Sequence, residues 1–165
     1  VLHSAMTPGD PARALADALR LSNVVVGSQL RESLSPAVVD VDVSAEVRAA
    51  LAEFGALAVA RQVALDVSVP DTPVRAQGQP LWMKQAVRNL LMLAIDRERA
   101  GGRVTVSLRK GGTGFALTVT DTGANLPDDE LGLAIVHEVC HRFHLELDFS
   151  RPVTGGLEVR LQSAG

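Results

Sequence analysis

The sequence predicts an α+β protein, a two-layer α/β sandwich preceded by an amphipathic helix. In some segments the apolar residues recur at the spacing of one helix face, and in others they alternate with polar residues, as in a half-buried strand. These patterns follow one another without the regular strand–helix–strand order of a parallel sheet. With 165 residues, 47% of them hydrophobic, the chain is long enough to bury one substantial core.

The first predicted helix spans residues 12–34. Pro11 takes the first helical position after a turn, and Pro36 disfavours helical geometry in the residue before it. Apolar side chains recur along one side of this helix, whereas charged side chains lie between them. We therefore expect its apolar stripe to pack against a partner.

Residues 39–43 and 63–69 alternate between apolar and polar side chains, which predicts two strands. Ser44 is the expected N-cap of a helix that continues to about residue 60. A turn follows at residues 70–73, where two prolines flank Asp and Thr.

The second half of the chain contains two further helices, a hairpin and two last strands. The hairpin is predicted from two alternating segments around a Gly-Gly turn. The expected helices span 79–98, beginning at Pro80, and 129–143, and the expected strands span 103–109, 114–120, 145–149 and 156–161.

Charge and composition limit the possible binding partners and indicate the cellular compartment. A net charge of -3 and a pI near 5.8 provide no cationic field for duplex DNA or an anionic membrane. The lone Cys140 lies in an apolar helical pattern, which indicates a small buried hydrophobe in a reducing cytosol. No apolar run approaches the roughly 20 residues that span a bilayer. Because the chain begins at Val1, we expect a cytoplasmic fragment whose membrane anchor, if any, lies upstream.

Three motifs follow one another in the second half, around the predicted hairpin. The helix segment Val87–Asp96 has the sequence VRNLLMLAID, and it places Asn89, Leu93 and Asp96 on one face. TDTGANLP follows the second hairpin strand, and LGLAIV opens the next helix. In this order the motifs resemble the N, G1 and G2 boxes of the ATP-binding domain of sensor histidine kinases, the GHKL or Bergerat-fold domain.

The resemblance implies an ATP site with magnesium as its metal ion. Asp121 would accept a hydrogen bond from the adenine amino group, and Gly123 would let the backbone approach the base. Asn89 would lie near the phosphates and is a candidate magnesium ligand, because magnesium prefers oxygen ligands. Gly132 would give room to phosphates at a helix N-terminus. A local hydrogen bond is the alternative role for Asn89.

Several positions depart from the family pattern. Leu93 stands where the family has a magnesium-binding asparagine, and we expect it to pack against a neighbour. Asn125 and Glu130 replace glycines, and a carboxylate at residue 130 repels phosphate. Residues 126–130 are too few for an ordinary ATP lid, and the last glycine box is reduced to Thr154-Gly-Gly. Each lost charge-assisted contact removes about 1.5–3 kcal/mol, so two or three such losses would turn a micromolar site into a roughly millimolar one.

The resemblance implies the ATP-binding domain of a bacterial two-component sensor histidine kinase, in residues 38–165. Residues 1–37 resemble a remnant of its dimerisation hairpin, so a homodimer through this helix and a response-regulator receiver domain are the expected partners. The phosphorylated histidine would lie outside this chain, in which no catalytic residue is identified. The alternative is a non-catalytic pseudokinase module that acts in dimerisation or regulator docking.

A literal HExxH motif points to a different chemistry. His137, Glu138 and His141 have the spacing of a zinc peptidase, with two histidines one helical turn apart and a glutamate base. His144 comes too soon to supply the third ligand of the extended motif. We therefore expect a solvated stripe of histidines on the last helix, with adventitious zinc or nickel binding as its only metal chemistry.

Overall fold

The computed structural model describes residues 13–18, 21, 38–111, 114–123, 130–153 and 155–163. Residues 13–18 are helical, and the rest of the helix predicted over 12–34 lies outside the described residues except for Leu21. The elements that follow are β1 (Val39–Asp42), α2 (Val43–Ala60), β2 (Ala64–Ser68), β3 (Arg75–Gly78), α3 (Pro80–Asp96), β4 (Arg103–Gly111), β5 (Gly114–Asp121), α4 (Glu130–Phe143), β6 (Leu145–Ser150) and β7 (Leu157–Ser163).

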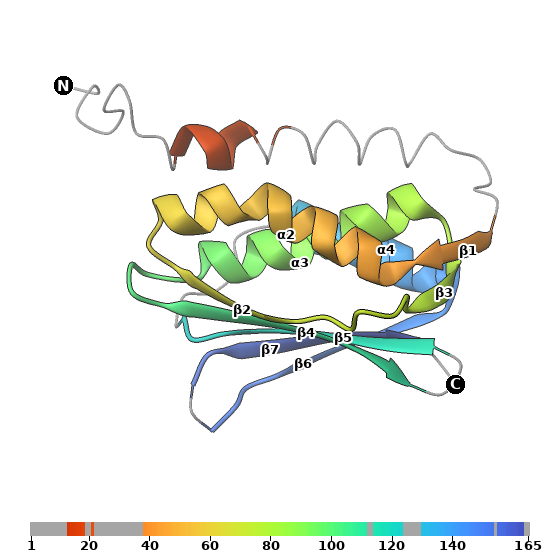
Figure 1. The fold of residues 1–165 in the computed structure, drawn as a ribbon. Helices are drawn as coiled ribbons and strands as arrows, with labels where there is room; N and C mark the ends of the chain where they lie inside the picture. Colours follow the sequence, from red (N-terminus) through yellow and green to blue (C-terminus); the bar gives the residue numbers. More distant parts are fainter. Residues whose placement is uncertain are drawn as a thin grey trace.

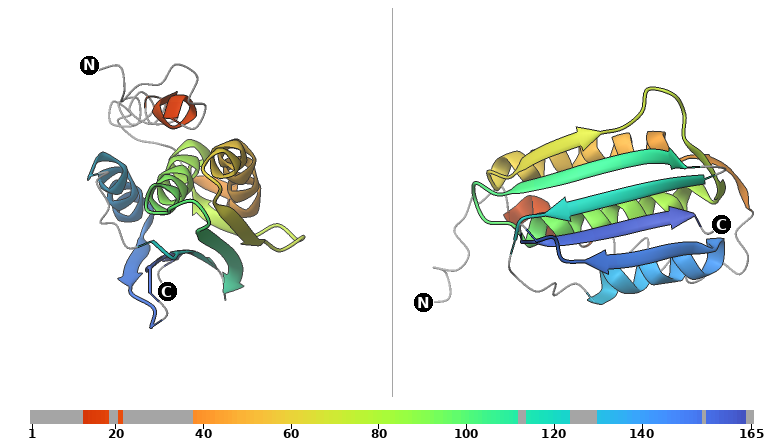
Figure 2. Two further views of the ribbon diagram at one scale, coloured as in Figure 1. Left: turned by 90° about the vertical axis from the view of Figure 1, so that its left-hand side faces the viewer. Right: turned by 90° about the horizontal axis from the view of Figure 1, so that it is seen from below.

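The architecture has two layers, as the sequence predicts. Five strands form one sheet in the order β2-β4-β5-β7-β6, in which β2 and β4 run parallel and all other neighbours run antiparallel. Helices α2, α3 and α4 lie side by side over one face of this sheet (Figures 1 and 2). Residues 13–18 lie on the other side of the helices (Figure 1), where Ala16 joins the hydrophobic core.

The alternation of the sequence divides the sheet into a buried and a polar face. Val106, Val119 and Val159 are register partners on the three central strands and are buried. The side chains between them, such as Thr118 and its partner Arg160, are polar and point away from the helices. Burial of one face against the helices therefore determines the register.

Helix α3 is the centre of the helical layer, between α2 and α4. Thirteen of its 17 residues are buried, so this helix has no broad solvent-facing side. Gln79 caps its N-terminus by accepting from the backbone N–H groups of Leu81 and Trp82, and Pro80 takes the first helical position. Trp82 meets Phe143 of α4 edge to face, with ring centroids 6.1 Å apart.

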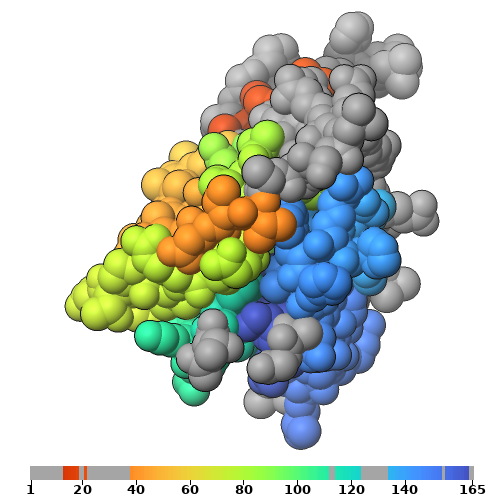
Figure 3. All heavy atoms as spheres, turned by 90° about the vertical axis from the view of Figure 1, so that its right-hand side faces the viewer, coloured from red at the N-terminus to blue at the C-terminus, as the bar shows by residue number. Residues whose placement is uncertain are grey.

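Strand β3 was not predicted from the sequence. It pairs antiparallel with β1, from Val39 opposite Gly78 to Asp42 opposite Arg75. Its sequence, RAQG, has one apolar residue and no β-branched residue, so neither pattern nor propensity marks it as a strand. The strand forms because its backbone pairs with β1, although α2 and β2 separate the two strands in the sequence. On the face seen in Figure 3, β1 (orange) lies between the yellow-green segment that includes β3 and the blue atoms of α4.

The N-cap of α2 is Asp42, and the prediction of Ser44 was wrong. Val43 is already helical, so the chain leaves β1 one residue earlier than expected. The Asp42 carboxylate accepts from the Ala45 N–H at 3.1 Å and from the Ser44 hydroxyl. The hydrogen bond from Ser44 is the main reason that the pKa of Asp42 is lowered. Ser44 itself is buried and accepts from Val74 N, which joins α2 to the chain before β3.

None of the helices in the described ranges combines the length and the apolar character that a bilayer crossing requires.

Candidate functional site

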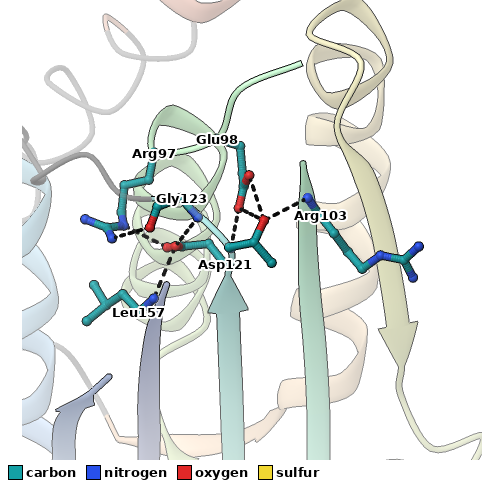
Figure 4. Close-up of polar contacts among 7 residues, drawn as sticks. Arg97, Glu98, Arg103, Asp121, Gly123 and Leu157 are labelled. Carbon is teal, nitrogen blue, oxygen red and sulfur yellow. Dashed lines mark hydrogen bonds and ion pairs between the residues drawn. The ribbon is translucent and has the colours of Figure 1, made fainter. Parts of the chain in front are cut away.

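The candidate site lies where α3 and β5 end and β7 begins (Figure 4). Asp121 is the last residue of β5, and its register partner is Leu157, the first residue of β7. Arg97 follows the last residue of α3 and turns its side chain toward this strand end (Figure 4). The fold thus brings together three segments that are far apart in the sequence.

The Asp121 carboxylate is buried and is bound on both oxygens. Its Oδ1 accepts from the backbone N–H groups of Gly123 at 3.1 Å and Leu157 at 3.3 Å. Its Oδ2 accepts from Nε of Arg97 at 2.9 Å. The Arg97 guanidinium also donates from Nη2 to the Gly123 carbonyl, at 3.1 Å. The side chains of Arg97 and Asp121 are only 1% and 3% exposed, so the pair is closed to solvent.

Burial dominates the electrostatics of Asp121. Removal from water raises the pKa of this carboxyl above its usual value, although Arg97 and the two backbone donors act in the opposite direction. The attraction of Arg97 therefore does not fully compensate the desolvation of the carboxylate. A buried pair of this kind adds little net stability, because the cost of desolvation offsets the attraction between the charges.

Two glycines permit the close approach of these segments. A Cβ on Gly123 would lie 2.0 Å from the carbonyl oxygen of Arg97, and a Cβ on Gly156 would lie 1.8 Å from that of Asp121. Gly156 also has a φ of +84°, in the left-handed region. The missing side chain of Gly123 thus makes room for the chain's own backbone at the end of α3.

A second polar cluster ties the end of β5 to the end of α3. Glu98 accepts from the backbone N–H of Thr122 and from its hydroxyl, the latter at 2.9 and 3.0 Å. The same hydroxyl accepts from the backbone N–H of Arg103 at 3.4 Å, at the start of β4 (Figure 4). These contacts hold Asp121 and Gly123 at a defined distance from the helix.

Two of the three N-box side chains, those of Asn89 and Leu93, are buried, and that of Asp96 is partly exposed. Asn89 is 2% exposed, and its side-chain amide donates to the backbone carbonyl of Gln85 at 2.7 Å, the local bond that was the alternative to a nucleotide contact. Leu93 is 3% exposed and belongs to the hydrophobic core, in keeping with the expected packing role. Asp96 forms an ion pair with Arg61 at 2.7 Å. Along the helix axis Asn89 is about 12 Å from Arg97, toward the N-terminus of α3. The bond between Asn89 and Gln85 therefore does not connect Asn89 to the polar groups around Asp121.

Gly132 lies in the first turn of α4, as predicted. The Asn125 position, residues 126–129 of the short loop and Thr154 lie outside the described residues. A nucleotide role was predicted for four residues, Asn89, Asp121, Gly123 and Gly132. Among these four, a hydrogen bond joins Asp121 to Gly123.

The histidines of the HExxH motif lie on the outside of α4. His137 and His141 are exposed, as expected, and His144 follows the helix end with a φ of 54°. Glu138 forms an ion pair with Arg142, one turn later, at 2.8 Å. Among the described residues, no three His, Cys, Asp or Glu side chains are grouped to hold a metal ion.

Cys140 is buried, as predicted, and its reactivity gives a first test. Burial raises the pKa of its thiol to about 11 from 9.0, so at about pH 8 the thiolate population falls about a hundredfold. We expect alkylation by iodoacetamide, followed by mass spectrometry, to be about a hundredfold slower in the native protein than in the denatured chain. Equal rates in the two states would contradict the burial of Cys140.

Arg97 is the site residue that sequence reasoning missed. It belongs to a run of four charged residues, Asp96 to Arg99, which normally indicates a solvated end of a helix. The only available signal was its position directly after the N-box helix. The chain between the helix and the hairpin folds back onto the end of β5, and this contact buries Arg97.

Comparison with known proteins agrees with the fold and the motif order. Residues 78–163 match the family described as histidine kinase-, DNA gyrase B- and HSP90-like ATPase. Over 143 residues the chain is 28% identical to sensor histidine kinase ZraS of Escherichia coli K12, an alignment covering 74% of the chain and 30% of ZraS. The chain thus spans less than a third of the length of that relative.

Solved structures of similar fold include two histidine kinases. The cytoplasmic segment of histidine kinase QseC superposes with a TM-score of 0.69 at 22% identity, over 91% of this chain and 94% of that one. The mycobacterial sensor histidine kinase MprB has a TM-score of 0.64 at 26% identity, over 77% and 97% of the two chains. The protein therefore belongs to the histidine kinase-, DNA gyrase B- and HSP90-like ATPase family. Its domain is the ATP-binding domain of the sensor histidine kinase type.

Proposed function

We propose that this domain binds ATP weakly and serves a two-component sensor histidine kinase, with Asp121 as the acceptor for the adenine amino group. The observation that carries the proposal is the position of this carboxylate. It ends a central strand beside the C-terminal end of α3, and backbone N–H groups of Gly123 and Leu157 orient one of its oxygens. An oriented acceptor of this kind suits a ligand that donates a hydrogen bond.

The phosphates would extend from this point toward the start of α4, where Gly132 lies in the first turn. Asn89 is the candidate for the phosphate end and for magnesium, and it would have to give up its bond to Gln85 to serve there. Leu93, buried in the core, provides no oxygen ligand. This is the main reason to expect weak binding of the magnesium–nucleotide complex.

In the complete protein the γ-phosphate would pass to a histidine outside this chain and then to the receiver domain of a response regulator. We propose residues 38–165 as the ATPase domain and residues 1–37 as the remnant of a dimerisation hairpin, which would pair two copies of the protein. The domain would act in the cytoplasm. The relationship to ZraS, a sensor histidine kinase, supports this context.

Calorimetric titration with ATP, with and without magnesium, tests the proposal. We expect the native protein to bind ATP with a Kd between about 10 µM and 1 mM, and Asp121→Ala to weaken binding at least about tenfold, since a hydrogen bond to a charged acceptor contributes about 1.5–3 kcal/mol. Asp66→Ala is the matched control, because Asp66 is an exposed aspartate on β2. Circular dichroism would confirm that each variant is folded.

A folded Asp121→Ala variant that binds ATP as tightly as the native protein would exclude Asp121 as the adenine acceptor. No binding by the native protein at millimolar ATP would favour the rival function, a non-catalytic module for dimerisation or regulator docking. The buried Leu93 at the expected magnesium position is the observation that supports this rival.

A further inference from the structure

The Arg97 guanidinium covers the acceptor that the proposed function assigns to adenine. Its Nε lies 2.9 Å from Asp121 Oδ2, and its Nη2 lies 3.1 Å from the Gly123 carbonyl oxygen. A guanidinium is planar and presents several N–H donors in a fixed geometry. The adenine edge is also planar and places an amino donor toward its acceptor. Under the proposed function, the guanidinium and the adenine amino group are therefore donors to the same carboxylate.

Binding of a base to the Asp121 carboxylate is limited by access to it more than by the number of its free acceptor positions. An ionised carboxylate has about four acceptor positions, and three donors occupy those of Asp121. One position is unused by these donors, but the carboxylate is only 3% exposed beneath a guanidinium that is only 1% exposed. Both members of the pair are enclosed, so a base would reach Asp121 only after Arg97 and the groups that enclose the pair have moved.

When Arg97 moves away, the buried Asp121 carboxylate needs another donor, and an incoming adenine amino group would supply it. Burial raises the pKa of Asp121 despite the nearby Arg97, so the ion pair does not fully compensate the desolvation of the carboxylate. Arg97 also lies outside α3, in the connection to β4, so its side chain can turn out without breaking the helix. A guanidinium that leaves the pair regains full hydration.

From this arrangement we infer that Arg97 is a built-in occupant of the adenine subsite, which nucleotide must displace in order to bind. The inference rests on the proposed nucleotide site at Asp121 and adds the element that regulates it. Any change that draws Arg97 toward another acidic partner would open the subsite.

Titration with adenosine tests the inference, because adenosine probes the adenine subsite without the phosphate and magnesium positions. Arg97→Met removes the guanidinium and keeps an unbranched apolar side chain in place of the arginine stem. We expect this variant to bind adenosine and ADP at least about tenfold more tightly than the native protein. A further Asp121→Ala substitution should remove the gain.

Arg88→Met is the matched control. Arg88 is a second buried arginine, within α3, but it pairs with Glu53 of α2 and covers Phe54. Its replacement should leave adenosine affinity unchanged. A similar gain in both variants would show a general loosening of the fold and would overturn the inference.

Three further outcomes have distinct meanings. If the native protein binds ATP and Arg97→Met binds nucleotide equally or less well, Arg97 does not block the subsite, although the proposed function stands. If neither protein binds ATP, ADP or adenosine at millimolar concentration while both are folded, the proposed function and the inference both fail. If Arg97→Met binds nucleotide more tightly than the native protein and Arg88→Met does not, the result supports both the proposed function and the inference.

Nuclear magnetic resonance provides a second measurement that does not depend on the folding of the variant. The Nε–H of Arg97 in the native protein should exchange slowly with solvent, as expected for a buried hydrogen bond. Saturation with ADP should shift this signal and increase its exchange rate. If ADP binds and leaves the Arg97 Nε–H signal unchanged, the inference is wrong.

Discussion

Replacement of Arg97 by methionine is expected to lower the free energy of unfolding by about 3–5 kcal/mol, because it leaves the Asp121 carboxylate buried without its charge partner. The pair is almost completely enclosed, so water cannot replace the guanidinium without a local rearrangement. Urea denaturation, followed by circular dichroism, measures the loss as a lower midpoint at unchanged slope.

A double variant separates the charge effect from lost packing. Asp121→Asn removes the buried charge and keeps a side-chain oxygen that can accept from Gly123 and Leu157. We expect Arg97→Met combined with Asp121→Asn to be more stable than the sum of the single effects by about 1–3 kcal/mol. Strict additivity would show that the two side chains contribute independently.

The Arg88→Met variant gives the matched comparison for stability. Arg88 Nη2 lies 2.9 Å from Glu53, but among the described residues its Nε and Nη2 have no hydrogen-bond partner of acceptable geometry. We take the contact as a weak ion pair, because the distance is short and the direction is poor. The Glu53 side chain is 33% exposed and can be hydrated when Arg88 is removed. We therefore expect a smaller loss than for Arg97→Met.

The second large effect is expected for Gly156→Ala. An added Cβ would lie 1.8 Å from the backbone oxygen of Asp121, and alanine is disfavoured at a φ of +84°. Left-handed geometry costs about 1–2 kcal/mol and overpacking about 1–3 kcal/mol, so we expect a loss of about 2–5 kcal/mol. Thermal and urea unfolding of the variant measure this loss.

Two other glycines are controls for the two parts of this effect. Gly101 has a φ of +89° and no atom within 4 Å of an added Cβ, so Gly101→Ala measures the backbone cost alone. Gly55 lies within α2 and also has open space around it, so Gly55→Ala should be neutral or stabilising by up to about 1 kcal/mol. If Gly156→Ala lost no more stability than Gly101→Ala, the close contact with Asp121 would be wrong.

The sequence by itself determined the layer architecture and the order of the main elements. Periodicity is a local property, so the alternation in β4 and β5 and the apolar pattern of α3 could be recognised without knowledge of their partners. The motif around Asp121 and Gly123 could likewise be recognised from its residue types and their order, and its nucleotide role stays a prediction. The buried Cys140 followed from its apolar surroundings in the helix.

Only the tertiary structure decided which polar groups meet. Strand β3 exists because β1 pairs with it, and the N-cap of α2 is Asp42 because β1 ends where that pairing ends. The partner of Asp121 is an arginine from a charged stretch that the sequence pattern places in solvent. Such contacts join residues 24 or more positions apart. Their formation depends on the whole packed fold, which no local pattern contains.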